Sequence, residues 1–516
     1  MKAIRILLLT LLAASLSVIY LSTNLAIGQI STITPAPAAF DNLQNGFDGP
    51  NPAGQTQFLN DQGAFSFDLP ISLGLGPTFN APACADCHQN PVIGGISQIR
   101  ELRAGHLDAS GNFISPVVPI NDGVEVTNPL TGLKEPATVP FNCSNPSINN
   151  QCGRSLMNLR AICPATDVQT TVNGITFKFP DVGVYERVPD AENVRTLRTS
   201  LNLLGDGFVE AIPDSAIQAV STGQCQNFSS VDPSPLFVNG EVADSTLPNP
   251  ANGICGQVLM VPVLECHDPN HPISCTNNGL AVGRFGWKDQ ISSLLSFSSD
   301  AYVNEMGISN RFPPNNDDFT HYCGIVSQPN DPNGSPANPA PVDLFARFVR
   351  ATKAPPRDTN LVNDADVKTG QTLFNHAGCA ICHFTQFTTA APGTPVDAGA
   401  LIVPAALGNK TIQPFSDFLL HNVGTGDGIV QNGPQNTANK LRTPPLWGVR
   451  IRPELMHDGL SMTFDESSST FNGQAAPSLF MGAILRHTGE AKNSITNFKA
   501  LSSAQKAQLI KFLQSL

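Results

Sequence analysis

Two short segments of cysteine and histidine constrain this chain more than any other feature. One reads Cys-Ala-Asp-Cys-His from Cys84 to His88, and the other reads Cys-Ala-Ile-Cys-His from Cys379 to His383. At this spacing two thiols can bond to the two vinyl groups on one edge of a porphyrin, and the next histidine can ligate its iron. Zinc would require four nearby ligands, and each segment has three. We therefore predict two covalently bound c-type haems, held by Cys84, Cys87, His88, Cys379, Cys382 and His383.

The sequence around the two segments is also similar. Phe79-Asn80 and Phe374-Asn375 each lie five residues before the first cysteine of their segment. A c-type cytochrome usually brings an aromatic side chain from a helix onto the haem at this point. We expect a helix over residues 367–374, and we interpret the chain as two cytochrome c modules.

The end of the chain favours a further helix. Ser502 and Ser503 can cap a helix that runs to Leu516. Within it, Leu509, Phe512, Leu513 and Leu516 fall on one helical face. A C-terminal helix that crosses the first helix of the module is typical of cytochrome c folds. An ordinary core helix is equally consistent with this pattern.

The first residues indicate export. Lys2 and Arg5 precede an apolar run from Ile6 to Leu21, and small residues follow before Gln29. This layout is that of a signal peptide over residues 1–28. An uncleaved membrane anchor is the alternative, but the run is short and contains polar residues. We expect a periplasmic or secreted protein without stable membrane insertion.

Eight of the twelve cysteines lie outside the C-x-x-C-H segments. An even number in an exported protein suggests disulfides, up to four of them. Cys143 with Cys152, and Cys266 with Cys275, are close enough in sequence for each pair to close a loop. The net charge of -12 argues against nucleic-acid partners and would suit a basic redox partner.

Further segments follow one another in order along most of the chain after residue 28. They are Leu75–Asn80, Pro91–Gly95, Glu210–Asp214, Gly283–Lys288, Glu305–Ile308, Arg442–Gly448, His457–Gly459 and Arg486–Ala491. Together with the two cysteine segments, they resemble the di-haem oxidoreductases, also known as thiol oxidoreductase-like proteins. That family is related to the bacterial di-haem cytochrome c peroxidases.

The resemblance implies a mainly α fold with two cytochrome c-like haem domains, long loops and a Cys-rich insertion. The first domain would span residues 29–345, with the insertion at about 140–280, and the second would span 346–516. The Pro- and Asn-rich stretch 328–341 marks the expected boundary.

The resemblance also suggests axial ligands on the second face of each iron. His487 stands where the peroxidases place an axial methionine, and Met456, Met462 and Met481 are its rivals. His106, in a segment that we expect to be a flexible loop, would be a displaceable ligand of the first haem. A surface histidine is an equally good interpretation of His106.

Glu305 matches the acid/base glutamate of the peroxidase relatives. Cleavage of a peroxide requires a proton to move from one oxygen to the other, and a carboxylate over an open haem face can move it. A surface acid at a helix end is the alternative for Glu305.

Other family positions are expected to support the haems rather than to ligate them. His457 and His421 are more consistent with supporting roles than with ligation. Trp287 could lie between the haems, with Phe208 as a looser match and a plain core position as the simplest alternative. Relatives often hold calcium between the domains, but Arg452 stands near where a ligand threonine is expected.

These implications lead to one expected function and two alternatives. The expected enzyme reduces hydrogen peroxide at the first haem with electrons that a small donor protein, such as a cytochrome c, delivers through the second. The alternatives are a non-enzymatic electron-transfer cytochrome and an oxidase or oxygenase that acts on an organic or protein substrate. Fold alone does not separate them.

Overall fold

The computed structural model describes most of the chain after its first 31 residues. Side chains are described for 32–76, 78–116, 155–160, 188, 190–225, 249–268, 273–312, 339–461 and 479–516, with short strands between these ranges. The predicted signal peptide, the pair Cys143 and Cys152, and most of the stretch 328–341 lie outside them. Among the described helices, none has the length and apolar character needed to cross a bilayer.

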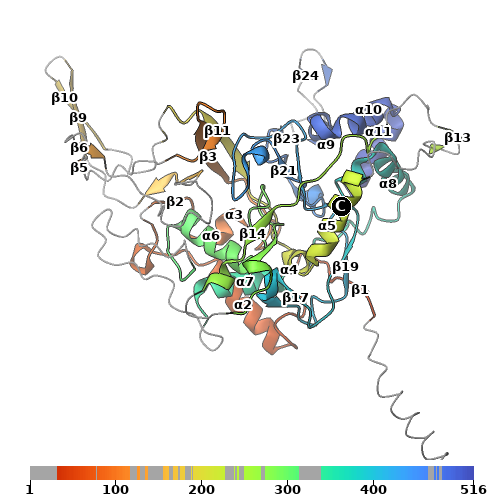
Figure 1. Ribbon diagram of the computed structural model, residues 1–516, viewed down its shortest axis with the longest axis horizontal. Coiled ribbons are helices and arrows are strands. Elements are labelled where there is room, and N and C mark those ends of the chain that lie inside the picture. The colour runs from red at the N-terminus through yellow and green to blue at the C-terminus, as the bar shows by residue number, and fades with distance from the viewer. Residues whose placement is uncertain are drawn as a thin grey trace, which may run out of the picture.

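Four helices lie together and contribute side chains to the first hydrophobic core (Figure 1). They are α2 (Ala53–Phe65), α4 (Asp206–Glu210), α6 (Leu294–Met306) and α7 (Pro341–Ala351). Phe58 and Phe65 of α2 stack on Phe348 of α7, with ring centroids 5.3 and 4.9 Å apart. Asp61 of α2 also accepts two hydrogen bonds from Arg347 of α7, so an apolar contact and an ion pair fix the crossing of these two helices.

The second core is built from the last third of the chain. Its helices are α8 (Ala365–Ala377), α9 (Leu479–Leu485), α10 (Lys492–Ala500) and α11 (Ser503–Leu513). Helix α8 begins at the capping side chain of Asp364 and ends at Gly378, whose φ of +92° favours glycine. Helix α11 begins with a capping box at Ser502 and packs along α8. Both helices predicted from the sequence are therefore confirmed.

The strands are short, and the largest sheet holds four of them. Its order is β11 (Val194–Thr199), β3 (Arg100–Leu107) and β4 (Phe113–Ile114), with β7 (Leu156–Met157) also paired to β3. A mixed sheet joins β1 (Thr34–Pro35), β19 (Lys410–Ile412) and β16 (Phe387–Thr388). It ties the first residues described to the second half of the chain.

The remaining elements include two helices and a series of short strands. Helices α3 (Cys84–Cys87) and α5 (Asp214–Gln226) complete the α-helices described. The other strands form two-stranded pairs: β2 (Thr78–Phe79) with β8 (Arg160–Ala161), β5 (Glu125–Thr127) with β6 (Lys134–Pro136), β9 (Asp167–Val172) with β10 (Ile175–Pro180), β12 (Phe237–Val238) with β13 (Glu241–Val242), β14 (Met260–Pro262) with β15 (Leu280–Val282), β17 (Pro395–Val396) with β18 (Leu401–Ile402), β20 (Leu420–His421) with β21 (Leu441–Arg442), β22 (Glu454–Leu455) with β23 (Ser461–Met462), and β24 (Thr470–Phe471) with β25 (Gln474–Ala475).

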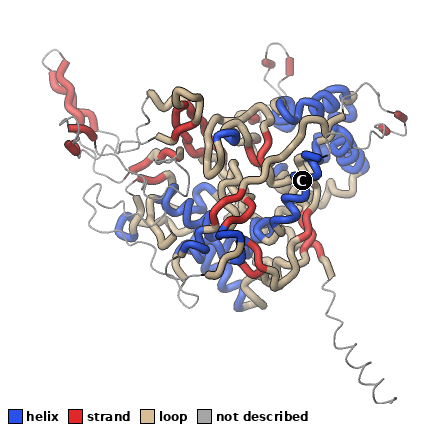
Figure 2. The backbone as a smooth tube through the Cα atoms, in the orientation of Figure 1, coloured by secondary structure: helices blue, strands red, loops and turns tan. Residues whose placement is uncertain are grey.

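The architecture agrees only in part with the mainly α expectation. Long loops connect the elements, as expected (Figure 2). The structure nevertheless mixes helices with many short strand pairs and a four-stranded sheet. Within the predicted insertion at 140–280, Phe208, Val209 and Ile217 are fully buried in the first core.

The predicted division at residue 345 falls inside α7, which packs as one unit on α2 and α6. Residues such as Phe387, Val403 and Phe418 from the second half also belong to the first core. The division into two domains remains a prediction, but a boundary near 345 does not follow the packing.

The described part of the chain contains two disulfides, and one of them was predicted. Cys266 and Cys275 form the predicted loop-closing disulfide. Cys225 and Cys255 form a second disulfide that the sequence did not pair, and it joins the end of α5 to the segment before β14. The distance between the two cysteines in space, rather than their separation in sequence, determines this second pairing.

Candidate functional site

The second C-x-x-C-H segment opens into an apolar cavity. Cys379, Cys382 and His383 line it from the end of α8, and His487 lines it from the end of α9. Phe374 of α8 lies against His383, with ring centroids 6.2 Å apart. The fold thus brings together all four residues that were predicted to bind the second haem.

Three imidazoles are each hydrogen-bonded through Nδ1, so that Nε2 remains available to ligate a metal. Nδ1 of His88 donates to Gly95 O (3.2 Å), Nδ1 of His383 to Phe415 O (3.0 Å), and Nδ1 of His487 to Ala483 O (2.9 Å). A donating Nδ1 leaves Nε2 as the unprotonated nitrogen, which is the form that ligates a metal. Burial lowers the pKa of both His88 and His383 to about 4, so both rings are neutral at pH 7.

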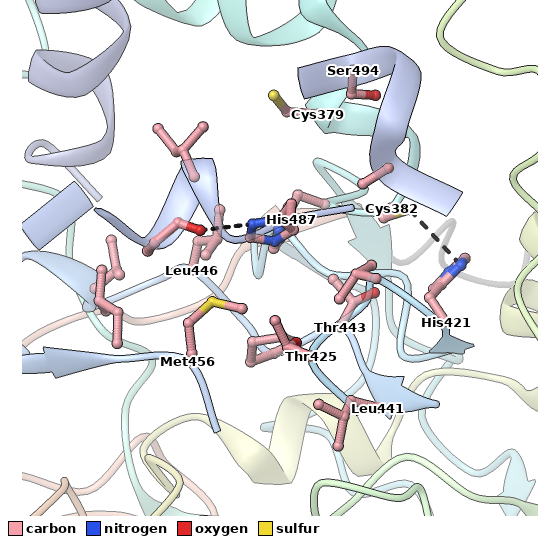
Figure 3. A pocket seen from close by; sticks show the side chains of 18 of the residues that line it. Cys379, Cys382, His421, Thr425, Leu441, Thr443, Leu446, Met456, His487 and Ser494 are labelled. Carbon is pink, nitrogen blue, oxygen red and sulfur yellow. Dashed lines mark hydrogen bonds between the residues drawn. The ribbon is translucent and has the colours of Figure 1, made fainter. Parts of the chain in front are cut away.

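Figure 3 shows His487 and Met456 at the same cavity. Both line it, so Met456 remains the competing ligand. Met481 packs in the second core instead of lining the cavity, and the side chain of Met462 lies outside the described part. The fixed Nδ1 of His487 favours the imidazole, because it presets the ring for ligation.

His421 supports this cavity through a chain of buried contacts. Its Nε2 donates to Asp417 (2.9 Å) and its Nδ1 donates to Glu490 (2.8 Å). Burial opposes its charge, yet Cys382 and Asp417 raise the pKa of His421 well above its ordinary value. Both nitrogens are thus engaged, which agrees with a supporting role rather than ligation.

Cys382, Asp417 and His421 also form the one group among the described residues that meets the spacing of a three-ligand metal site. Cys382 Sγ lies 3.9 Å from His421 Nδ1 (Figure 3). That sulfur is required for the thioether bond to a haem, and both His421 nitrogens already contact carboxylates. Haem attachment and a metal at this group therefore compete for the same atom.

The first C-x-x-C-H segment lines a second cavity. Cys84 and Cys87 of α3, with His88, form one side. Glu305 comes from the last turn of α6 and Glu101 from β3. The fold therefore places the predicted acid/base glutamate at the first haem segment, 217 positions along the chain from His88.

Glu305 is held in place by Asn80. The side-chain amide of Asn80 donates to Glu305 Oε2 (2.8 Å), and the Asn80 backbone N–H donates to Glu305 O (2.7 Å). Burial and the Glu101 charge raise the pKa of Glu305 to about 8. Glu305 thus carries a proton near neutral pH, as a group that exchanges protons with a ligand must be able to do.

The structure does not place His106 at this cavity. His106 lies in strand β3, not in a flexible loop, and its Nδ1 donates to Glu192 (2.7 Å). The side chain is 38% exposed and is not among the residues that line the cavity. Its pairing in the regular ladder of the sheet explains the difference, so the expected displaceable ligand becomes a surface residue of the sheet.

The Phe-Asn pair that precedes each C-x-x-C-H segment does not have the same structure in the two places. Phe374 lies in a helix against its histidine, but Phe79 lies in strand β2. Phe65 of α2 takes the equivalent place at His88, with ring centroids 6.5 Å apart. Each histidine therefore has an aromatic neighbour from a helix that crosses a second helix, α2 with α7 and α8 with α11.

Trp287 lies between the two cavities. Among the described residues, it alone lines both. Its Nε1 donates to Thr199 O (2.9 Å), and its ring meets His457 edge-on at 6.1 Å. Phe208 and Trp447 are buried in the first core and line neither cavity.

The cysteines of the two cavities fit thioether attachment. Cys84, Cys87, Cys379 and Cys382 are free thiols, although other cysteines of the chain form disulfides. Burial raises the pKa of Cys84 and of Cys379 to about 12, so these thiols stay neutral. Two free thiols and a neutral imidazole on an apolar wall are the set that a covalently bound haem requires.

The family model described as "Di-haem oxidoreductase, putative peroxidase" matches residues 244–516. The chain belongs to this family. The match includes the second C-x-x-C-H segment, His487 and Glu305, whereas the first segment lies before it. Haem is therefore the cofactor of this di-haem oxidoreductase.

Two solved structures match parts of this di-haem oxidoreductase. A xenon-pressurised hydrazine synthase of Kuenenia stuttgartiensis is 19% identical, with 35% of this chain and 56% of that chain covered and a TM-score of 0.19. A MauG-like protein associated with microbial copper homeostasis is 18% identical, with 34% and 52% covered and a TM-score of 0.20. The chain spans about half the length of each. No curated protein matches the sequence.

Three functional-site residues were missed by sequence reasoning. Glu101, Arg103 and Arg198 line the first cavity from β3 and β11. Glu101 and Arg103 are two residues apart, so a strand at this position would place both side chains on one face. That spacing could have identified the pair from the sequence. Arg198 had none, because its place depends on the pairing of β11 with β3.

Proposed function

We propose that this protein is a di-haem c-type cytochrome that reduces hydrogen peroxide with electrons from a small redox protein. The observation that carries the proposal is the difference between its two cavities. The second contains two imidazoles with available Nε2 atoms, His383 and His487. The first contains one imidazole, His88, together with the carboxyls Glu101 and Glu305.

Each cavity would hold one haem in its own cytochrome c-like domain. Cys84, Cys87 and His88 would hold the first, and Cys379, Cys382, His383 and His487 the second. When bound, the haems supply the redox chemistry, with a peroxide site on the first iron and an electron entry site on the second. Glu305 would hold and move the proton beside the first site, and Trp287 would give an aromatic contact between the two sites.

Calcium is not part of the proposal. Calcium prefers six to eight oxygen ligands. In the part of the chain that the structure describes, the one candidate group for a metal includes the sulfur of Cys382. Arg452, near the expected calcium position, donates to Ser200 O and brings a positive charge of its own.

The direct test is peroxide turnover by the purified holoprotein with a reduced small cytochrome as donor. Glu305→Gln should lower the turnover by about 10²–10⁴-fold, as expected when a general acid–base is removed. Glu192→Gln, the same change at the partner of His106 outside the cavity, should leave it unchanged. Absence of turnover above free haem, in both oxidised and half-reduced protein, would contradict the proposal.

Spectra of the same preparation separate the alternatives. Two low-spin irons that bind neither cyanide nor peroxide would indicate an electron-transfer cytochrome instead. Oxidised organic or protein products would indicate an oxidase or oxygenase. Export would be tested by the N-terminal sequence of the mature protein, which should begin near Gln29.

A further inference from the structure

A charged strand face forms one wall of the first cavity. Glu101 and Arg103 are two residues apart in β3, so both side chains project from the same face. Arg103 donates two parallel hydrogen bonds to Glu101, from Nε to Oε1 (2.8 Å) and from Nη2 to Oε2 (2.9 Å). Forked pairs of this kind are the strong, geometrically specific ones.

The neighbouring strand adds a second positive charge. Arg198 of β11 stands directly opposite Glu101 in the ladder and lines the same cavity. Its side chain is 1% exposed and pairs with the equally buried Asp427. Burial alone would raise the pKa of Glu101, but Arg103 and Arg198 lower it below its ordinary value.

Glu305 faces Glu101 across the cavity wall, and a hydrogen bond joins the two carboxyl groups. Two ionised carboxylates are both acceptors, so this bond requires one proton between them. Asn80 Oδ1 accepts from the Leu159 N–H (3.0 Å), so the Asn80 amide is oriented with its NH₂ toward Glu305. The positions of both carboxyls are therefore set from opposite sides.

The other charged or titratable groups that line this cavity come from four elements. They are His88 and the two thiols of the haem segment, Arg100 and Arg103 of β3, Arg198 of β11, and Asp300 of α6. Arg100 is paired with Glu454. Arg103 makes its forked contact to Glu101 and not to Glu305, so the cations favour charge on Glu101.

We propose that Glu101 is a positioning residue of the first site: held ionised by Arg103 and Arg198, it keeps one shared proton on Glu305, beside the place of a haem ligand. The inference rests on the proposed function, because it takes this cavity as the first haem site. Glu305 gives up this proton and recovers it during a reaction, so the pair undergoes no net change.

The test is an infrared titration of protonated carboxyl groups in the oxidised holoprotein. The band that Glu305→Gln removes belongs to Glu305, and its pH midpoint reports the shared proton. Glu101→Gln should lower that midpoint by about one pH unit or more, since it removes the like charge beside Glu305. Glu101→Asp keeps the charge and should restore much of the shift, and Glu192→Gln should cause none.

Haem content and the visible spectrum of each variant show whether it has folded. If Glu101→Gln fails to bind haem, Arg103→Gln replaces it, because loss of the fork should let the shared proton pass to Glu101 and so weaken the Glu305 band. The inference is overturned by an unchanged Glu305 midpoint in folded Glu101→Gln, by an unchanged Glu305 band in folded Arg103→Gln, or by a midpoint shift in Glu192→Gln equal to that in Glu101→Gln. The titration requires no peroxide turnover, so its outcome is separate from that of the proposed function.

Discussion

At the scale of single residues, the chemistry of this protein depends on how each imidazole and carboxyl is held. The three histidines with available Nε2 atoms all donate from Nδ1 to a backbone carbonyl, and this contact fixes both tautomer and orientation. His106 and His421 donate to carboxylates instead. The partner of Nδ1 therefore separates the candidate ligands from His106 and His421.

His487→Met should raise the reduction potential of the second haem by a fraction of the roughly 0.8 V that axial ligands span. A thioether opposite a histidine raises the potential relative to a bis-histidine pair. Potentiometry with EPR of the holoprotein measures it, and Met456→Leu is the control at the same cavity. A changed ligand signature in Met456→Leu alone would identify the thioether as the native ligand.

At the scale of elements, two helix crossings support the two haem segments. The α8–α11 crossing depends on Gly370, where an added Cβ would lie 2.0 Å from Gln508 O and 2.9 Å from Phe512 Cβ. The backbone of α11 cannot move away without shifting Phe512, which contacts Phe374 at 5.2 Å. A close approach of backbones thus positions the aromatic ring beside His383.

Gly370→Ala should lower the free energy of unfolding by about 1–3 kcal/mol, because it overpacks this crossing. Gly482→Ala is the matched control in α9, where an added Cβ would meet nothing within 4 Å. There the helix propensity of alanine should stabilise the protein by up to about 1 kcal/mol. Denaturant unfolding of both holoproteins measures the pair, and equal effects would contradict the role of the crossing.

At the scale of the whole molecule, buried polar contacts join distant parts of the chain between the two cavities. Asp427 lies between Arg198 (2.8 Å) and Lys288 (3.2 Å), with all three side chains 1% exposed. Lys288 also donates to the carbonyls of Thr437, Ala438 and Lys440. This cluster locks the loop after Asp427 onto the wall that separates the cavities.

Asp427→Asn should destabilise the protein by about 3–5 kcal/mol at neutral pH, since it leaves two buried cations without their anion. Burial would raise the pKa of Asp427, but Arg198 and Lys288 lower it well below its ordinary 3.8. Its contribution is therefore present above pH 3.8 and is lost as the pH falls below that value. The free energy of unfolding of Asp427→Asn and of the wild type should be measured at neutral and at acid pH. The difference between the two values should become smaller as the pH falls. Asp366→Asn, at an exposed surface pair, should change stability far less.

Trp287→Phe should slow the equilibration of electrons between the haems, because Trp287 alone among the described residues lines both cavities. Loss of its hydrogen bond to Thr199 should also cost about 1 kcal/mol of stability. Stopped-flow reduction, followed at the two haem spectra, measures the rate. Trp447→Phe makes the same change at a buried tryptophan outside both cavities, and an equal slowing there would argue against a path at Trp287.

Local spacing determined part of this protein in advance. The C-x-x-C-H segments, helices α8 and α11 and the Cys266–Cys275 disulfide depend on residues close together in the chain, so the sequence alone was sufficient to predict them. The family resemblance located Glu305 and His487, which the fold brings to the first and second cavities.

Only the tertiary structure decided the rest. Phe65 rather than Phe79 lies at His88, His106 belongs to a sheet, and Glu101 meets Glu305. These contacts join segments far apart in sequence, and strand register and helix crossing set them. Neither can be obtained from the spacing of residues along one segment, because each depends on a partner elsewhere in the chain.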